Sequence, residues 1–338
     1  MRIPVIVLSG FLGSGKTTLL LKLLDEARSR GLQPGVIMNE LGSMDVDGHI
    51  LNENTGTPVQ KLLDGCICCT KRSELAGGIQ TICKQNPDVI FIELTGVANP
   101  EEIADALTEP KVLGLVSLKQ IVTVLDAEHV LEYNSIFQTD LTLLRTLRRQ
   151  IETADLILVN KSDLVNSPRL DKIDKTVRKL NDTAKLIHTT HSKIDSDLLL
   201  GSITQQVRQA IPVVRSRGAL KAVPAQNVRS DAETTGDRHE HETLSYSRIK
   251  TLTIPISSES PLPSRKQIER FVYQFKDQLL RAKGYIKLDK EPSSSLMQYA
   301  GKRLNWSVSD YSGEPYIVFI GIDLNEQLLR MEWKREIG

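Results

Sequence analysis

A glycine-rich run near the start of the chain has the composition of a phosphate-binding loop. The run GFLGSGKT (residues 10–17) matches the pattern G-x-x-x-x-G-K-[ST]. Its glycines allow consecutive backbone N–H groups to curl around a phosphate, because no Cβ atom obstructs the approach. Lys16 can reach the β- and γ-phosphate oxygens, and the Thr17 hydroxyl can coordinate Mg²⁺. The residues predicted to hold the nucleotide phosphates are Gly10, Gly13, Ser14, Gly15, Lys16, Thr17 and Thr18.

The tetrapeptide NKSD (residues 160–163) contains the residue types that read a guanine base. The carboxylate of Asp163 can accept hydrogen bonds from both N1 and the 2-amino group of guanine, two donors that adenine does not present together. Asn160 would contact N7 and O6 of the base, while the stem of Lys161 would cover the base or brace the phosphate loop. The pattern is short, but its place at the end of an apolar run and downstream of a phosphate loop supports GTP as the nucleotide.

Two further apolar runs end in a carboxylate. Glu93 follows Val89–Ile92, and Asp126 follows Gln120–Leu125. Glu93 can act on Mg²⁺ or its water shell, or it can orient the attacking water, and the residues alone leave both roles open. The N–H of Gly96 can approach the γ-phosphate because no side chain obstructs it. The predicted catalytic residues are Lys16, Thr17 and Glu93, whereas Asp126 is more typical of a structural role.

Three of the four cysteines lie in one tetrapeptide, at Cys66, Cys68 and Cys69. Thiolates at this spacing can bind Zn²⁺ or Cu(I) with a fourth ligand from elsewhere in the chain. Cys66 and Cys69 also form a C-x-x-C pair, so a redox dithiol is an alternative, and burial as small apolar side chains is another. Neighbours this close cannot form a disulfide framework for so long a chain, which favours a reducing compartment. Cys83 stands alone on a predicted helix and is typical of packing.

Apolar runs alternate with helical patterns over the first two-thirds of the chain. This alternation predicts an α/β fold with a mainly parallel sheet flanked by helices. The runs are nearly continuous in apolar character, as expected for strands that are buried on both faces. A helix is predicted at Thr17–Arg30, directly after the phosphate loop, because its leucines share one face. The predicted strands are Ile3–Leu8, Pro34–Met38, Val89–Ile92, Gln120–Leu125, Leu156–Val159 and Ala184–His188.

The composition changes near residue 215, where a polar stretch containing DAETTGDRHEHET begins. We expect a P-loop GTPase domain over residues 1–214, a polar linker or loop over residues 215–244, and a smaller C-terminal α/β domain over residues 245–338. In the last part, the pattern predicts strands at Thr251–Ile256 and Tyr316–Gly321 and a helix at Ser264–Arg281.

The 338-residue chain is nearly neutral, with 43 Lys and Arg residues against 42 Asp and Glu residues and a net charge of +1. This balance argues against nucleic acid and membranes as partners that are bound through charge. No apolar run reaches the ~18–20 residues that span a bilayer, and glycines interrupt the first apolar run where a secretion signal would continue. Together with the cysteine pattern, these features predict a cytoplasmic protein.

The motifs, taken in order, resemble those of the CobW-type metallochaperone GTPases. The shared elements are GFLGSGKTT, NELG (residues 39–42), GCICC (residues 65–69), ELTG (residues 93–96) and NKSD. This family belongs to the same broad class as the nickel-delivery GTPases of urease and hydrogenase maturation. The segments RAKGY (residues 281–285) and IVFIG (residues 317–321) resemble the C-terminal domain of the family. The resemblance therefore covers nearly the whole chain.

The resemblance implies that residues 66–69 bind zinc or another transition metal. It also implies that residues 39–47 form a switch segment in which Glu40 serves either that metal or Mg²⁺. The family often carries a second acid in this segment, where this chain has Ser43, so an accessory metal site is in doubt unless Asp45 or Asp47 replaces that acid. The family's linker is often rich in histidine, and here it holds two, at positions 239 and 241.

The implied function is a GTP-hydrolysing metallochaperone, with GTP and Mg²⁺ bound at the phosphate loop and a client apo-metalloprotein as the recipient of zinc. No arginine finger is identifiable, so intrinsic turnover is expected to be slow. Association of the chain with copies of itself is compatible with this function. The alternatives are a metal-storage or sensing protein with the nucleotide as a structural ligand, a redox switch built on Cys66 and Cys69, and a carrier of cobalt or iron. Sequence does not separate these ions, because thiolates favour copper and zinc by affinity alone.

Overall fold

The computed structural model describes residues 2–39, 59–62, 69–96, 98–134, 141–205, 247–256, 262–289, 291, 293–300 and 302–337. These residues form one sheet of seven strands and one of five. We call the part built on the first sheet, up to residue 205, the parallel-sheet unit, and the part from residue 247 the antiparallel-sheet unit. The predicted linker over residues 215–244, with both of its histidines, lies outside the described residues.

The seven-stranded sheet is parallel throughout, as the alternation of apolar runs and helices predicted. Its strand order is β3-β2-β4-β1-β5-β6-β7. The central strands are buried from end to end, which explains their continuous apolar sequences. The strands are β1 (Ile3–Ser9), β2 (Pro34–Asn39), β3 (Val59–Leu62), β4 (Val89–Glu93), β5 (Val116–Asp126), β6 (Leu156–Asn160) and β7 (Lys185–Thr189).

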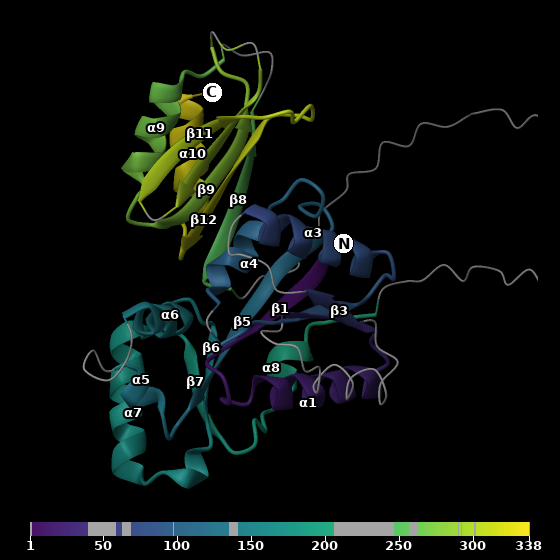
Figure 1. The fold of residues 1–338 in the computed structure, drawn as a ribbon, viewed down its shortest axis with the longest axis vertical. Helices are drawn as coiled ribbons and strands as arrows, with labels where there is room; N and C mark the ends of the chain where they lie inside the picture. Colours follow the sequence, from purple (N-terminus) through teal and green to yellow (C-terminus); the bar gives the residue numbers. More distant parts are fainter. Residues whose placement is uncertain are drawn as a thin grey trace, which may run out of the picture.

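Helices cover both faces of this sheet (Figure 1). Leucines of α1 and α8 pack on one face. On the other face α3 and α4 cover the half around β1, β2 and β4, and α6 and α7 cover the half around β5 and β6. No helix within the described ranges is both long and apolar enough to cross a membrane. The helices are α1 (Lys16–Ser29), α3 (Cys69–Cys83), α4 (Pro100–Ala106), α5 (Val130–Tyr133), α6 (Leu141–Glu152), α7 (Ser167–Leu180) and α8 (Asp197–Leu200), with a 3₁₀ turn, η1, at Ser162–Leu164.

The strand order reverses beside β1. Strands β2, β3 and β4 lie on one side of β1, and β5, β6 and β7 lie on the other. In an open parallel sheet, the loops that leave the carboxyl ends of the strands at such a reversal diverge and open a crevice for a ligand. The phosphate loop, Glu93, Asp126 and Asn160 all lie at or directly beyond these carboxyl ends. The topology therefore gathers the predicted site residues at one edge.

The antiparallel-sheet unit has the strand order β11-β10-β9-β12-β8, and all four neighbouring pairs are antiparallel. One face of this sheet packs against α9 and α10 around Phe271, Phe319 and Trp333. The elements are β8 (Ile249–Pro255), α9 (Arg265–Gln274), β9 (Leu279–Ile286), β10 (Ser295–Ala300), β11 (Arg303–Val308), β12 (Tyr316–Ile322) and α10 (Glu326–Glu336).

The predicted helix at Ser264–Arg281 is wrong at its C-terminal end. The helix α9 ends at Gln274, and residues 279–286 form β9, which pairs with both β10 and β12. A strand between two neighbours satisfies its backbone on both sides and buries Leu279, Ala282 and Ile286, and this gain outweighs the local helical pattern. The strands β3, β10 and β11 were not predicted. The sequences of β3 and β10 carry no clear alternation, whereas RLNWSV of β11 alternates polar and apolar residues and could have been predicted as a strand.

The two units share a core. Tyr316, Val318 and Ile320 of β12 pack with α3, α4 and β1 of the parallel-sheet unit. Two pairs of opposite charge flank this apolar contact: Arg281 of β9 with Asp105 of α4 (2.9 Å), and Lys283 of β9 with Glu109. In Figure 1, α4 lies where the end of the five-stranded sheet meets the parallel-sheet unit. This helix is therefore anchored in both units.

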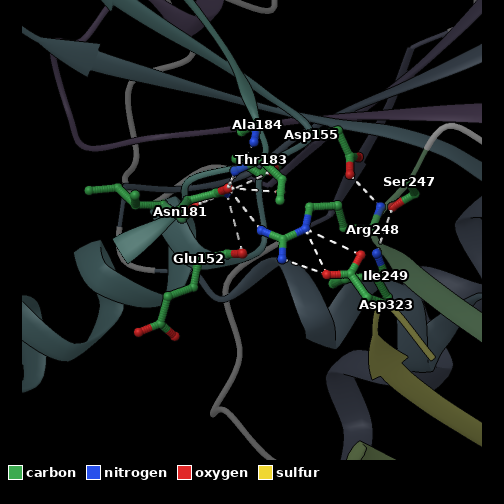
Figure 2. Close-up of polar contacts among 11 residues, drawn as sticks. Glu152, Asp155, Asn181, Thr183, Ala184, Ser247, Arg248, Ile249 and Asp323 are labelled. Atoms are coloured by element: carbon green, nitrogen blue, oxygen red, sulfur yellow. Dashed lines mark hydrogen bonds and ion pairs between the residues drawn. The ribbon is translucent and has the colours of Figure 1, made fainter. Parts of the chain in front are cut away.

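Arg248 makes a second connection between the units (Figure 2). Its guanidinium pairs with Asp323 (2.6 Å) and donates to the Asn181 side chain (2.8 Å), while its backbone N–H donates to Asp155. Asp155 also accepts from the backbone N–H of Ile121 (2.6 Å), so it joins the middle of β5 to the residues that directly precede β6 and β8. This network lies at the amino end of the parallel strands, away from the predicted site.

Candidate functional site

The phosphate loop connects β1 to α1. Gly10, Gly13 and Gly15 have φ angles of 132°, 74° and 107°, a region that side chains with a Cβ rarely adopt. A Cβ on Gly10 would lie 2.1 Å from the Val124 carbonyl oxygen. A Cβ on Gly15 would lie 2.4 Å from Nδ2 of Asn160. Glycine is thus required both for the loop's conformation and for its close packing on the neighbouring strands.

Lys16 is the first residue of α1 and is buried, with only 6% of its surface exposed. Its ammonium donates to the Phe11 carbonyl oxygen (3.0 Å), so the side chain folds back over the loop. Burial lowers the pKa of Lys16, and the nearby Glu93 carboxylate partly opposes this shift. The start of α1 also presents the positive end of a helix dipole. These features favour a bound anion.

Thr17 and Glu93 meet at the carboxyl edge of the sheet. The Thr17 hydroxyl donates to Oε1 of Glu93 (2.8 Å), although 76 residues separate them in the sequence. The buried strand β4 pairs with β1, and the register Leu8↔Glu93 fixes this carboxylate beside the start of the phosphate loop. A hydroxyl and a carboxylate together are oxygen ligands of the kind that Mg²⁺ takes. The Thr17 hydroxyl and the Glu93 carboxylate therefore fit a Mg²⁺ site.

Ser14 supplies a direct indication of a missing polar partner. Its Oγ is fully buried in the phosphate loop and has no hydrogen-bond partner among the described residues. A buried hydroxyl without a partner is costly. Phosphate oxygens of a nucleotide held by the loop would be a suitable acceptor. Of the other two hydroxyl residues predicted to contact the phosphates, Thr17 is half-buried and Thr18 is exposed at the surface of α1.

Asn160 braces the phosphate loop. Its Nδ2 donates to the Ser14 carbonyl oxygen (2.8 Å), and its Oδ1 accepts from the Ser192 N–H (2.8 Å). Ser192 Oγ in turn donates to the Gly15 carbonyl oxygen (3.0 Å). Asn160 therefore fixes the phosphate loop to the segment that follows β7, and its predicted contact with N7 and O6 of the base stays a prediction.

Lys161 is held by an ion pair, whereas Asp163 is exposed to solvent. Lys161 has a φ of 59° and donates to Oδ2 of Asp126 (2.7 Å), which holds its stem across the end of β5. Desolvation alone would raise the pKa of Asp126, but hydrogen bonds from Lys161, from the Glu128 N–H and from His129 lower it overall. Asp163 is exposed in η1, so its carboxylate is available to a ligand.

Sequence reasoning missed two groups of residues at this edge. Ser192, which holds the phosphate loop, lies in no recognisable motif, and only the fold brings it to Gly15. Phe11 of the phosphate loop stacks on Tyr133 of α5 with ring centroids 5.1 Å apart. Phe11 thus packs the phosphate loop against α5, the helix that follows the end of β5 at Asp126.

The loop after β4 lies against the phosphate loop. A Cβ on Gly96 would lie 2.7 Å from the Leu12 backbone nitrogen, so only glycine fits this approach. Leu94 donates to the Leu8 carbonyl oxygen (2.9 Å), which continues the β1–β4 ladder up to this point. The predicted place of Gly96 beside the nucleotide phosphates is compatible with this geometry.

Most of the predicted transition-metal ligands are outside the described residues. These ligands are Glu40, Cys66 and Cys68. Ser43, which replaces the family's second acid, and the alternative acids Asp45 and Asp47 also lie outside the described residues. The backbone of Cys69 begins α3, and its side chain is not described. Cys83, at the end of α3, is half-buried, and burial raises the pKa of its thiol to about 11, as expected for a packing residue.

The fold and the phosphate loop define a P-loop nucleotide-binding protein of the parallel-sheet class. Residues 4–188 match the family described as "CobW/HypB/UreG, nucleotide-binding domain", and residues 253–336 match the "Cobalamin synthesis protein cobW C-terminal domain". The chain belongs to this family, which confirms the resemblance in its motifs.

Named relatives agree with this placement. The zinc chaperone YjiA of Escherichia coli is 29% identical, over 97% of this chain and 96% of that protein. The zinc-regulated GTPase metalloprotein activator 1 of Schizosaccharomyces pombe is 34% identical over 57% of this chain, which spans about half (47%) of that relative's length. The zinc chaperone YeiR of Escherichia coli is 31% identical, over 57% of each chain. A crystal structure of Zn(II)-bound YjiA GTPase is similar with a TM-score of 0.45 and 22% identity, covering 100% of both chains.

Proposed function

We propose that this protein binds and hydrolyses GTP. The observation that carries the proposal is the convergence of Lys16, Thr17 and Glu93 at one edge of the sheet, with Asn160 bracing the loop between them. The backbone of residues 10–15 and the buried Ser14 hydroxyl would bind the phosphates, and the Lys16 ammonium would neutralise the β- and γ-phosphate oxygens.

Mg²⁺ would be held by Thr17, with Glu93 acting directly or through a metal-bound water. When bound, this ion would neutralise charge on the phosphates and orient them for in-line attack. The hydrogen bond between Thr17 and Glu93 supports this role for Glu93 over that of a remote water-orienting base. Specificity for guanine would come from the exposed carboxylate of Asp163, with Lys161 held in place by Asp126.

We also propose that Cys66, Cys68 and Cys69, with Glu40, bind Zn²⁺ as cargo for a client apo-metalloprotein. Soft thiolates favour this ion, and three relatives carry names that include zinc. In the chain these residues lie between the end of β2 and the start of α3, and α3 packs with α4 over β4. A change at the end of β4 on GTP binding would therefore reach the metal-binding segment through packed elements. Because the thiols must be reduced, we place this activity in the cytoplasm.

The deciding experiment measures the Zn²⁺ affinity of the purified protein by chelator competition, first with GDP and then with a non-hydrolysable GTP analogue. We expect at least a tenfold difference, about 1.4 kcal/mol of coupling, and by reciprocity an equal effect of Zn²⁺ on GTP affinity. The double substitution Cys66→Ser/Cys68→Ser should abolish stoichiometric binding, whereas the control Cys83→Ser should preserve it.

Other outcomes would favour the alternatives. Equal and tight affinities in both nucleotide states would indicate storage or sensing. No stoichiometric zinc would direct the same titration to cobalt and iron. A disulfide of defined potential between Cys66 and Cys69, without metal, would indicate a redox switch.

A further inference from the structure

Gln150 is a fully buried polar residue that the phosphate-binding machinery described above does not include. It lies near the end of α6, with 0% of its surface exposed. Its neighbours Leu147 and Ile151 belong to the core between α6 and the sheet, and its carbonyl oxygen accepts from the Thr123 hydroxyl of β5 (2.8 Å). The backbone at this position is therefore fixed to the sheet.

The amide of Gln150 holds the loop that follows β4. Its Nε2 donates to the Gly96 carbonyl oxygen (3.2 Å) and to the Ala98 carbonyl oxygen (3.0 Å). Both amide hydrogens are thus used on one loop. On its other side the same loop touches the phosphate loop, where Gly96 approaches the backbone of Leu12. The segment is held between Gln150 and the phosphate loop.

The oxygen of the same amide is in a different position from the nitrogen, because it lacks a partner. Oε1 of Gln150 is buried and has no hydrogen-bond partner among the described residues. An unsatisfied buried acceptor is unfavourable, and an apolar side chain of similar size would avoid that cost. Glutamate would instead place acceptors against two carbonyl oxygens. Gln150 therefore has one unsatisfied acceptor and two satisfied donors. The contact that explains glutamine at this position is the one that the two donors make with the loop after β4.

We propose that Gln150 is a positioning residue for recognition of the γ-phosphate, and that it sets how strongly the protein distinguishes GTP from GDP. This inference rests on the proposed GTP binding. Only the γ-phosphate differs between the two nucleotides, and loops at the ends of such strands respond to it. With the carbonyls of Gly96 and Ala98 held, the backbone of Gly96 is presented to the phosphate edge without first having to be ordered.

The test compares the affinities of wild type and Gln150→Leu for fluorescent GDP and for a non-hydrolysable GTP analogue. We expect GDP affinity to stay within about threefold, and GTP-analogue affinity and kcat to fall by about tenfold or more, since two hydrogen bonds to the loop are lost. A purely structural role would weaken both nucleotides alike. Gln150→Glu, which keeps the shape of the side chain, should show the same selective loss.

The matched control is Thr153→Val, which removes a buried hydroxyl that donates to the Arg149 carbonyl oxygen of α6 and does not contact the loop. It should leave the ratio of the two affinities unchanged. If the wild type binds both nucleotides and both Gln150 variants keep its ratio, this inference is overturned and the proposed function stands. If the wild type binds neither nucleotide, the proposed function fails and this inference fails with it.

Discussion

Lys16 carries a positive charge in a place where burial disfavours it. The side chain is almost wholly enclosed, its pKa is lowered by desolvation, and its ammonium donates to a carbonyl oxygen of the loop. A buried cation close to a helix N-terminus is stabilised by an anion, so the residue is matched to phosphate. At this scale the chemistry of the site depends on single side chains whose environment is fixed by neighbours far away in sequence.

Replacing Lys16 by Ala should lower the affinity for the GTP analogue by at least about 100-fold, because charge-assisted hydrogen bonds to two phosphates are lost. Zinc affinity without nucleotide should be unchanged, and it should no longer respond to GTP. Isothermal titration calorimetry measures both quantities. Lys175→Ala, on the exposed side of α7, is the control. Unchanged GTP-analogue affinity in Lys16→Ala would remove Lys16 from the site.

In the proposed site, Asp163 would determine which base is bound, since its exposed carboxylate offers only acceptors. In Asp163→Asn one acceptor becomes an amide donor that opposes the guanine donors but matches the carbonyl at C2 of xanthine. We expect GDP affinity to fall by about 30-fold or more and XDP affinity to rise. Competition binding with both nucleotides measures the change, with Asp171→Asn on α7 as the control. Equal losses for both bases would argue against a base contact.

The helix α4 has a role that its length of seven residues does not suggest. It begins directly after the loop that touches the phosphate loop, and two of its acidic residues, Glu102 and Asp105, pair with β9 of the antiparallel-sheet unit. Arg281 contacts Glu102 (3.6 Å) and the nearly buried Asp105 (2.9 Å). One short element therefore joins the predicted γ-phosphate loop to the second unit.

Arg281→Ala removes the cation beside Asp105, whose side chain is only 3% exposed. Breaking this ion pair from one side removes the cation that compensates a desolvated carboxylate, so we expect the free energy of unfolding to fall by about 2–4 kcal/mol. Urea unfolding monitored by tryptophan fluorescence gives this value, because Trp306 and Trp333 both lie in the antiparallel-sheet unit. Arg303→Ala on the exposed edge strand β11 should change stability by less than about 0.5 kcal/mol. A loss in Arg281→Ala as small as that of the control would contradict the role of the pair.

At the scale of the whole molecule, the two units are joined through an apolar contact and through the network around Arg248. Asp155 lies at the centre of that network, and burial raises its pKa to about 6, while N–H donors from Arg248 and Ile121 oppose the shift in part. In the unfolded chain, Asp155 would have its ordinary pKa of 3.8. The connection between the units is therefore sensitive to pH.

The sign of this effect follows from proton binding. Between about pH 4 and pH 6 the folded protein holds a proton on Asp155 that the unfolded chain has released, so the stability contributed by this group is present at low pH and is lost as pH rises through 6. Relative to Asp155→Asn, the wild type should lose at most about 2 kcal/mol between pH 4.5 and pH 7. Urea unfolding across this range measures the difference. Asp182→Asn, an exposed carboxylate, should show no such trend, and a flat difference for Asp155 would refute the shift.

Local sequence was enough to predict much of the parallel-sheet unit. The strands β1, β4 and β6 are continuous apolar runs, and a helix directly follows a glycine loop, so pattern and structure coincide there. The prediction failed where pairing decides the conformation. Residues 279–281 read as helix but form part of β9, because two neighbouring strands satisfy their backbone.

For the site, the residues that can do chemistry were identifiable from their types and spacing alone: the glycines and Lys16 of the phosphate loop, the carboxylate of Glu93, the NKSD tetrapeptide and the cysteine cluster. Their side chains fix what they can bind, whatever the fold. The contacts between them required the folded chain: Thr17 meets Glu93, Asn160 and Ser192 brace the phosphate loop, and Gln150 holds the loop after β4. Those contacts join residues that are tens to more than a hundred positions apart. They arise because parallel strands bring their carboxyl ends to one edge, a consequence of strand order that no local pattern encodes.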